Sequence, residues 1–180
     1  MLYINCHTSN YADHAKKLVE SLEAFALPYE VEEFDSLGSW EANCQYKAEF
    51  IYEKWLEHGQ VVWLDADCMV KRQPGLFASI PSDVAFHLFK GKELLSGTLF
   101  FNDTIGAEQI LKAWIKKNKE KPGVWDQKNL AEVIRNLDVD ISYLPPEYCY
   151  IFDLSKLHYP NTHPVIEHYQ ASRGQKCKSY

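Results

Sequence analysis

The chain has 180 residues, of which 46% are hydrophobic and 24% charged, which is the composition of an ordinary globular protein. Its formal net charge of −6 argues against nucleic acid or an anionic membrane surface as the main partner, because both would be repelled. We therefore expect one domain over residues 1–180, in which any phosphate-bearing ligand is held locally by a metal ion or a few cations.

In the first half of the chain, apolar runs alternate with segments of helical spacing. Asn10 stands where it could cap a first helix, and Gly59 where it could end a second one. The unbroken apolar run Val61–Leu64 is typical of a central strand that is covered on both faces. The predicted strands are 2–6, 29–34 and 61–64, and the predicted helices cover about 12–25 and 48–56.

The pattern is looser in the second half, where Gly91 and Gly97 are turn-prone and are predicted to separate two strands. The predicted strands are 84–89, 98–101, 141–144 and 165–169, and the predicted helices cover about 107–115 and 125–137. This alternation favours an α/β sandwich whose sheet is mostly parallel in the first half of the chain.

The cysteines and the first residues bear on the compartment. The five cysteines are scattered, and no CxxC pair or Cys/His cluster has the spacing of zinc ligands, which favours a reducing compartment. The start of the chain lacks the basic and long apolar regions of a signal peptide. No apolar run approaches membrane-spanning length. We therefore expect a cytoplasmic protein with no transmembrane segment.

The strongest motif is Val-Val-Trp-Leu-Asp-Ala-Asp at positions 61–67. In open α/β sheets, ligands bind beyond the carboxyl ends of the strands, where Asp65 and Asp67 are expected to lie. If the backbone stays extended, residues two apart point the same way, so both carboxylates can face one site. Two such carboxylates suit a hard divalent cation and leave coordination positions for phosphate oxygens. The alternative is an acidic turn that simply follows a buried strand.

This hydrophobic strand followed by Asp-x-Asp resembles the DxD motif of nucleotide-diphospho-sugar transferases with the glycosyltransferase-A fold. Other segments are similar to that family, in the order in which it shows them, so that the resemblance covers most of the chain. They are Lys47–Phe50 on the helix before the motif, the Gly-containing strand Ser96–Asn102, the Asp-Gln of Trp125–Gln127, the Leu-Pro stretch Leu144–Tyr148, and Ile166–Tyr169, which would return a histidine to a metal.

The resemblance implies a three-layer α/β/α sandwich with a mixed, mostly parallel central sheet, as a minimal glycosyltransferase-A-like domain. The nucleotide-binding half would cover about residues 1–70, and the acceptor and metal half about residues 71–180. The chain is short for such an enzyme, so insertions that bind the acceptor would be trimmed or absent.

The resemblance also implies a site for Mn²⁺ or Mg²⁺. Asp67 would bind the metal directly, Asp65 would hold the metal or the donor ribose, and His168 would be the third protein ligand. Taken alone, His168 could equally be a core or surface histidine with no ligand. His158 and His163 are nearby competitors at positions predicted to lie in loops.

Further residues are predicted to bind the donor. By resemblance, Lys47 and Gly97 lie beside it, and Gly97 would let the sugar approach the backbone closely. Arg173 and Lys176 could neutralise the diphosphate, unless they only form a solvated basic tail. Thr8 follows the first strand and could contact the base or ribose, although the Ser/Asn cluster beside it could simply cap a helix.

Asp126 is the candidate for the acceptor side of the site. A carboxylate near the sugar carbon could orient or deprotonate an acceptor hydroxyl. The alternative is that Asp126 only complements the dipole at a helix N-terminus. Together with Asp65 and Asp67, Asp126 makes up the predicted catalytic set.

The predicted function is a hexosyltransferase-like enzyme. It would be a metal-dependent glycosyltransferase that moves a sugar from a nucleotide-diphosphate donor, by analogy a UDP-hexose, to a glycan or other hydroxyl acceptor. DxD with a late histidine leans toward retention of the anomeric configuration. Two alternatives stay open. One is a haloacid-dehalogenase-type phosphohydrolase, which also uses Asp-x-Asp but usually carries Thr or Val where Met69 stands. The other is a non-catalytic module that binds a nucleotide sugar.

Overall fold

The computed structural model describes residues 1–173, which form two β-sheets and five α-helices. The larger sheet has six strands in the order β2-β1-β3-β6-β5-β7, and the smaller has three in the order β4-β9-β8. The strands are β1 Leu2–His7, β2 Tyr29–Glu33, β3 Val61–Leu64, β4 Cys68–Val70, β5 Val84–Phe89, β6 Glu93–Phe101, β7 Ile141–Tyr143, β8 Tyr150–Ile151 and β9 Ile166–His168. The helices are α1 Ala12–Ala24, α2 Trp40–His58, α3 Ile105–Glu120, α4 Asp126–Asn136 and α5 Leu154–His158.

The large sheet is mixed, as the sequence predicts. Strands β2, β1 and β3 are mutually parallel, β6 runs antiparallel to both of its neighbours, β3 and β5, and β7 is parallel to β5. Every residue of β3 is buried, which confirms that Val61–Leu64 is a central strand covered on both faces.

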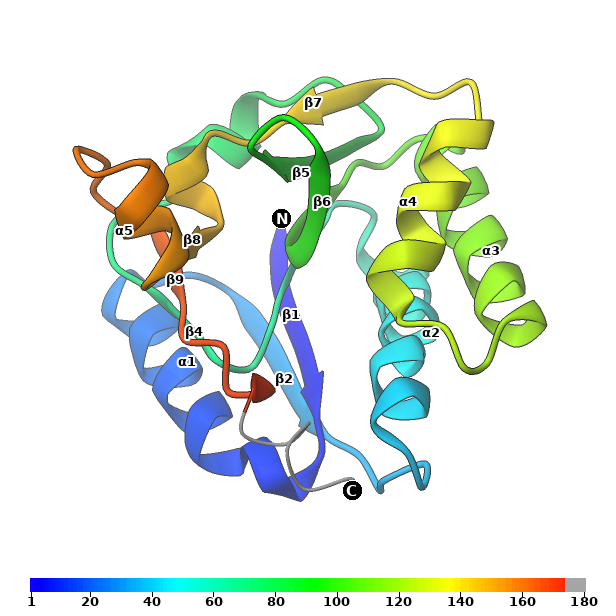
Figure 1. The fold of residues 1–180 in the computed structure, drawn as a ribbon, viewed down its shortest axis with the longest axis horizontal. Helices are drawn as coiled ribbons and strands as arrows, with labels where there is room; N and C mark the ends of the chain where they lie inside the picture. Colours follow the sequence, from blue (N-terminus) through cyan, green and yellow to red (C-terminus); the bar gives the residue numbers. More distant parts are fainter. Residues whose placement is uncertain (174–180) are drawn as a thin grey trace.

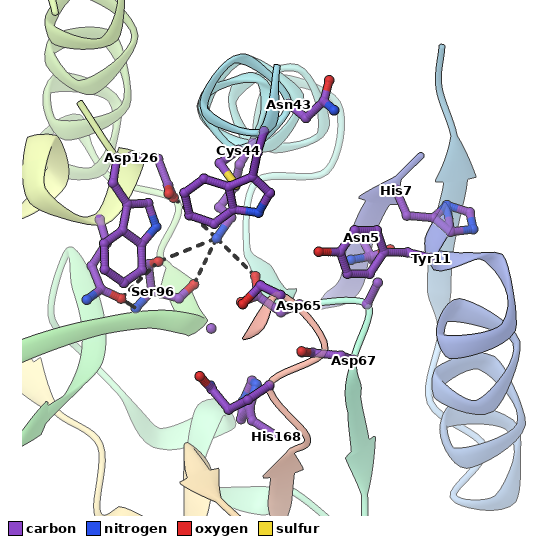
Figure 2. A pocket seen from close by; sticks show the side chains of 18 of the residues that line it. Asn5, His7, Tyr11, Asn43, Cys44, Asp65, Asp67, Ser96, Asp126 and His168 are labelled. Atoms are coloured by element: carbon purple, nitrogen blue, oxygen red, sulfur yellow. Dashed lines mark hydrogen bonds and ion pairs between the residues drawn. The ribbon is translucent and has the colours of Figure 1, made fainter. Parts of the chain in front are cut away.

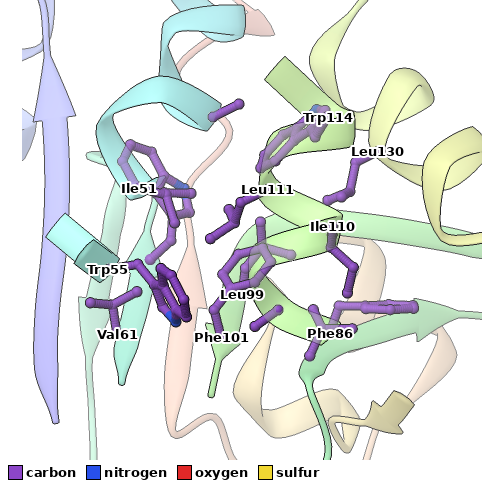
Figure 3. Packing of buried hydrophobic residues seen from close by; sticks show 14 of the residues in the cluster. Ile51, Trp55, Val61, Phe86, Leu99, Phe101, Ile110, Leu111, Trp114 and Leu130 are labelled. Carbon is purple, nitrogen blue, oxygen red and sulfur yellow. The ribbon is translucent and has the colours of Figure 1, made fainter. Parts of the chain in front are cut away.

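Helices cover both faces of this sheet, which confirms the three-layer α/β/α sandwich (Figure 1). On one face, α1 inserts Leu18 and Leu22 against Val62 and Leu64, and the small sheet adds to the same hydrophobic cluster. These two leucines are four residues apart and therefore lie on one side of the helix. On the other face, α2, α3 and α4 pack around Trp114, whose side chain is completely buried (Figure 3).

The predicted helix and strand ends differ from the structure at two places that matter. Asn10 caps no helix, because a 3₁₀ turn at Ser9–Tyr11 comes first and α1 then begins after Tyr11 without a side-chain cap. Gly97 lies inside β6 and not in a turn, because β6 starts at Glu93 directly after the turn at Gly91. The small sheet was missed apart from β9, since its strands have only two or three residues.

Within residues 1–173, no helix is both long enough and apolar enough to cross a membrane.

Candidate active site

The Asp-x-Asp segment leaves the carboxyl end of β3 and turns at once. The Cys68 amide donates to the Asp65 carbonyl at 3.1 Å, so the backbone turns at Ala66 and Asp67. The expectation of an extended backbone through these residues was wrong. The Asp65 amide still donates to the Gly97 carbonyl at 2.9 Å, which ties the motif to β6. The turn, rather than strand alternation, therefore directs both carboxylates toward one space.

His168 reaches the same space from the other end of the chain. It lies on β9, which pairs with β4 so that His168 stands opposite Cys68, one residue beyond Asp67. Potential ligand atoms of Asp65, Asp67 and His168 all lie within 4.8 Å of one another, and Figure 2 shows the three side chains around one opening. The Thr98 hydroxyl lies 2.9 Å from His168 Nε2, and such a contact at one nitrogen orients the ring for ligation through the other.

Gly97 makes room for this cluster. A Cβ atom at position 97 would lie 2.8 Å from Cε1 of His168 and 3.3 Å from Oδ2 of Asp65. The first distance is shorter than any ordinary contact, and the imidazole is held from behind by Thr98. The absence of a side chain at Gly97 thus lets the histidine stand beside the first aspartate.

The two carboxylates of the cluster, Asp65 and Asp67, repel each other and attract positive charge. Burial raises the pKa of Asp67, and the neighbouring charge of Asp65 raises it further. Burial would also raise the pKa of Asp65, but Lys47 and His168 more than offset this and leave that pKa lowered. The pKa of His168 is raised to about 9, because Cys149 and both carboxylates outweigh the effect of burial. Two carboxylates and an imidazole form a donor set that fits Mn²⁺ or Mg²⁺, and binding of the ion would release the proton that the raised pKa keeps on His168.

Lys47 joins this cluster to Asp126. Its Nζ lies 2.9 Å from Oδ1 of Asp65 and 3.3 Å from Oδ2 of Asp126 (Figure 2). Burial alone would lower the pKa of Lys47, but the two carboxylates outweigh burial and leave that pKa raised. Asp126 opens α4 and is completely buried, which raises its pKa although Lys47 counteracts the effect. The Trp63 indole donates to Oδ1 of Asp65 at 2.8 Å and completes the support of that carboxylate.

These groups line a cavity of about 440 Å³ at the carboxyl ends of β1 and β3. Of the predicted residues, it brings together Thr8, Lys47, Asp65, Asp67, Gly97, Asp126 and His168. Thr8 precedes the 3₁₀ helix at Ser9–Tyr11, and its hydroxyl accepts no capping hydrogen bond from that helix.

The remaining predicted residues lie elsewhere. Arg173 is not among the residues that line the cavity and instead pairs with Asp153, and Lys176 lies outside the described residues. The competing histidines are not in the metal cluster. His158 packs against Phe89, and the carbonyl of His163 accepts a hydrogen bond from Arg72.

The structure adds residues to which the sequence assigned no role. Gln127 accepts a hydrogen bond from the Ser96 amide at 3.0 Å and donates to Glu93 at 3.1 Å, which fixes the wall between α4 and β6. Trp40 and Trp125 stand near each other along the cavity, with ring centroids 6.0 Å apart. The Asp-Gln pair signalled Gln127, whereas aromatic content alone could not single out two of five tryptophans.

Comparison with solved structures identifies the fold, whereas the sequence matches no protein-family profile and no curated protein. A glycosyltransferase involved in the glycosylation of the major capsid of PBCV-1 superposes with a TM-score of 0.74 at 17% identity, over 97% of this chain and 95% of that one. This chain has a glycosyltransferase-A fold.

Two further glycosyltransferases of this fold are similar. The galactosyltransferase LgtC, solved with donor and acceptor sugar analogs, has a TM-score of 0.60 at 14% identity, over 94% of this chain and 87% of that one. GlyE of Streptococcus pneumoniae TIGR4 has a TM-score of 0.64 at 16% identity, over 93% of this chain, which spans only 54% of GlyE. At these identities the likeness concerns the fold, so the activity has to be argued from the site.

If Asp65, Asp67 and His168 hold the metal of a nucleotide-binding site, Gly97→Ala should weaken metal-dependent nucleotide binding about 10–100-fold, the range typical when the support of a metal ligand is disturbed. The added methyl group must displace His168, which Thr98 holds in place. Calorimetric titration of UDP with manganese would measure the loss. Gly75→Ala is the matched control, because a Cβ there meets nothing within 4 Å. Equal affinity in Gly97→Ala and wild type would show that His168 does not need its present position.

Proposed function

We propose that this chain is a metal-dependent glycosyltransferase that transfers a sugar from a nucleotide-diphosphate donor, by analogy a UDP-hexose, to a hydroxyl group of a glycan or similar acceptor. The observation that carries the proposal is the meeting of Asp65, Asp67 and His168 within 4.8 Å on the wall of a 440 Å³ cavity. It stands in a fold that the compared glycosyltransferases share.

The metal would be held by Asp65, Asp67 and His168. When bound, Mn²⁺ or Mg²⁺ supplies positive charge and Lewis acidity to the diphosphate that leaves the donor sugar. The ion would also add positive charge to a site in which the carboxylates of Asp65, Asp67 and Asp126 face the ammonium group of Lys47 and the imidazole of His168.

The chain's own residues would orient the reactants. Thr8, which follows β1 and lines the cavity, would contact the ribose or base, and the bare backbone at Gly97 would let a sugar come close. Lys47 fixes Asp65 for ligation through the salt bridge at 2.9 Å. Asp126 holds Lys47 from the opposite side, and its raised pKa makes it a better proton acceptor for an acceptor hydroxyl once that hydroxyl has entered the cavity.

Retention of the anomeric configuration is the outcome that we favour, on the resemblance of the Asp-x-Asp and late histidine pattern. Arg173 and Lys176 are retained as donor-binding candidates, although Arg173 would first have to leave Asp153. The two alternative functions gain no support. The compared structures are glycosyltransferases rather than phosphohydrolases, and no observation favours a module that only binds its ligand.

Calorimetric titration of UDP, GDP and UDP-sugars into the protein, with and without manganese, tests the proposal. We expect UDP or a UDP-sugar to bind in the presence of manganese and to lose that binding when the metal is chelated. Absence of binding by every nucleotide with manganese present would exclude the transferase, and a phosphatase assay would then be the next experiment.

A further inference from the structure

A second cleft, of about 590 Å³, opens between α4 and the β5–β7 side of the large sheet. It adjoins the candidate active site, because Glu93, Trp125 and Gln127 line both. The hydrogen bond from Gln127 to Glu93 at 3.1 Å stands at this shared wall. A molecule in the active site could therefore extend past this wall into the second cleft.

The floor of the second cleft is apolar. It is built from Leu88, Leu94 and Ile141 of the sheet and Ile134 of α4, and Tyr143 stands at its rim with 62% of its surface exposed. Aliphatic side chains offer a sugar few hydrogen-bond partners, whereas they suit an alkyl or aryl group. The cleft thus favours an apolar body over a further sugar unit.

Three cations stand around this floor. Lys92, Lys128 and Arg135 are exposed and form no ion pair among residues 1–173, and Arg135 donates only to the Ala131 carbonyl of its own helix. On the neighbouring α3, by contrast, the lysines are matched to carboxylates, as Lys117 is to Glu132 at 3.0 Å. Among the described residues that line the cleft, these three cations stand against one carboxylate, that of Glu93. In a chain with a net charge of −6, this local excess of positive charge beside an apolar cleft favours an anionic ligand.

We propose that the second cleft binds the aglycone of the acceptor, and that this acceptor is an anionic amphiphile in which an alkyl or aryl chain carries a phosphate group. The inference rests on the proposed transferase function. The acceptor hydroxyl would enter the active site past Gln127, the apolar chain would lie on the floor of the second cleft, and the phosphate would face Lys128 and Arg135.

Binding of octyl phosphate, measured by calorimetry below its micelle concentration, tests the inference without any need for transfer. Wild type is expected to bind octyl phosphate about tenfold more tightly than the uncharged n-octyl glucoside, and inorganic phosphate more weakly than either. In Lys128→Glu/Arg135→Glu, affinity for octyl phosphate should fall about tenfold and affinity for octyl glucoside should stay unchanged. Ala131→Trp, which narrows the cleft, should weaken binding of both amphiphiles.

The matched control is Lys16→Glu/Lys17→Glu on the exposed side of α1, which changes the net charge by the same amount away from the cleft. An equal loss in this control, equal affinity for the uncharged amphiphile, or no binding of octyl phosphate to wild type would each overturn the inference. Manganese-dependent UDP binding is measured on the same samples. If wild type does not bind UDP with manganese, the transferase function is contradicted. If it binds UDP but not octyl phosphate, only the proposal for the second cleft is contradicted.

Discussion

Asp67→Asn is expected to raise the melting temperature of the metal-free protein and to abolish the further rise that manganese and UDP produce in wild type. Asparagine keeps an oxygen that can accept the hydrogen bond which the Ala171 amide donates to Oδ2 of Asp67 at 2.6 Å, so the variant removes mainly the charge. Thermal unfolding with and without ligand, followed by circular dichroism, measures both effects.

The first effect follows from the raised pKa of Asp67, which burial and the neighbouring Asp65 cause. A carboxyl group whose pKa is higher in the folded than in the unfolded state destabilises the fold where it is charged, above its folded pKa. Below the unfolded value of about 3.8 it is protonated in both states, and the penalty disappears. The advantage of Asp67→Asn should therefore be largest above the folded pKa of Asp67, shrink as the pH falls through that pKa, and vanish below about 4.

The second effect follows from linkage. A ligand present at about 100 times its dissociation constant stabilises the folded state by about 2.7 kcal/mol, which corresponds to several degrees for a domain of this size. If Asp67 binds the metal, its replacement should remove most of that gain and weaken manganese-dependent UDP binding at least about 100-fold. A normal manganese-induced shift in Asp67→Asn would show that Asp67 is not a ligand, even if the metal-free variant is more stable.

Much of this site could be predicted from the sequence, because two of its features are local. The apolar run Val61–Leu64 followed by two aspartates fixes both a buried strand and the position of the acids at its end. The placement of His168 rested on resemblance alone, and the pairing of β9 with β4 now supplies a physical reason for it. For Gly97, a position beside the site was predicted correctly, but a turn was predicted where the residue lies within β6. The turn between β5 and β6 is shorter than the spacing of Gly91 and Gly97 suggested.

Contacts between distant residues were beyond the reach of the sequence. Lys47 and Asp126 are 79 positions apart, and no spacing predicts that their charges meet in the interior. Arg173 illustrates the converse, because its guanidinium group pairs with Asp153, whereas its charge and position had suggested a contact with the donor diphosphate. The second cleft is lined by several separate segments and likewise leaves no local pattern. Such features depend on how the layers pack, which propensity and periodicity do not encode.

Lys47→Met is expected to lower the free energy of unfolding by about 3–5 kcal/mol, the cost of removing one partner from a buried ion pair. The side chain of Asp126 is only 1% exposed and would keep a charge with no partner, whereas Asp65, with a side chain 37% exposed, is partly relieved by water. Urea denaturation at pH 7 without metal measures the loss. The double variant Lys47→Met/Asp126→Asn should recover part of it, because the isolated charge is gone.

Lys54→Met is the matched control. Lys54 lies on the same helix, its side chain is 9% exposed as is that of Lys47, and it also pairs with two carboxylates. Its partners Glu30 and Glu32 have side chains that are 34% and 51% exposed, so water can solvate them when the lysine is removed. We therefore expect Lys54→Met to cost no more than about 1 kcal/mol. Equal losses of unfolding free energy in the two variants would mean that Asp126 finds another partner. The salt bridges of Lys47 would then not be what links Asp126 to Asp65 and the metal cluster.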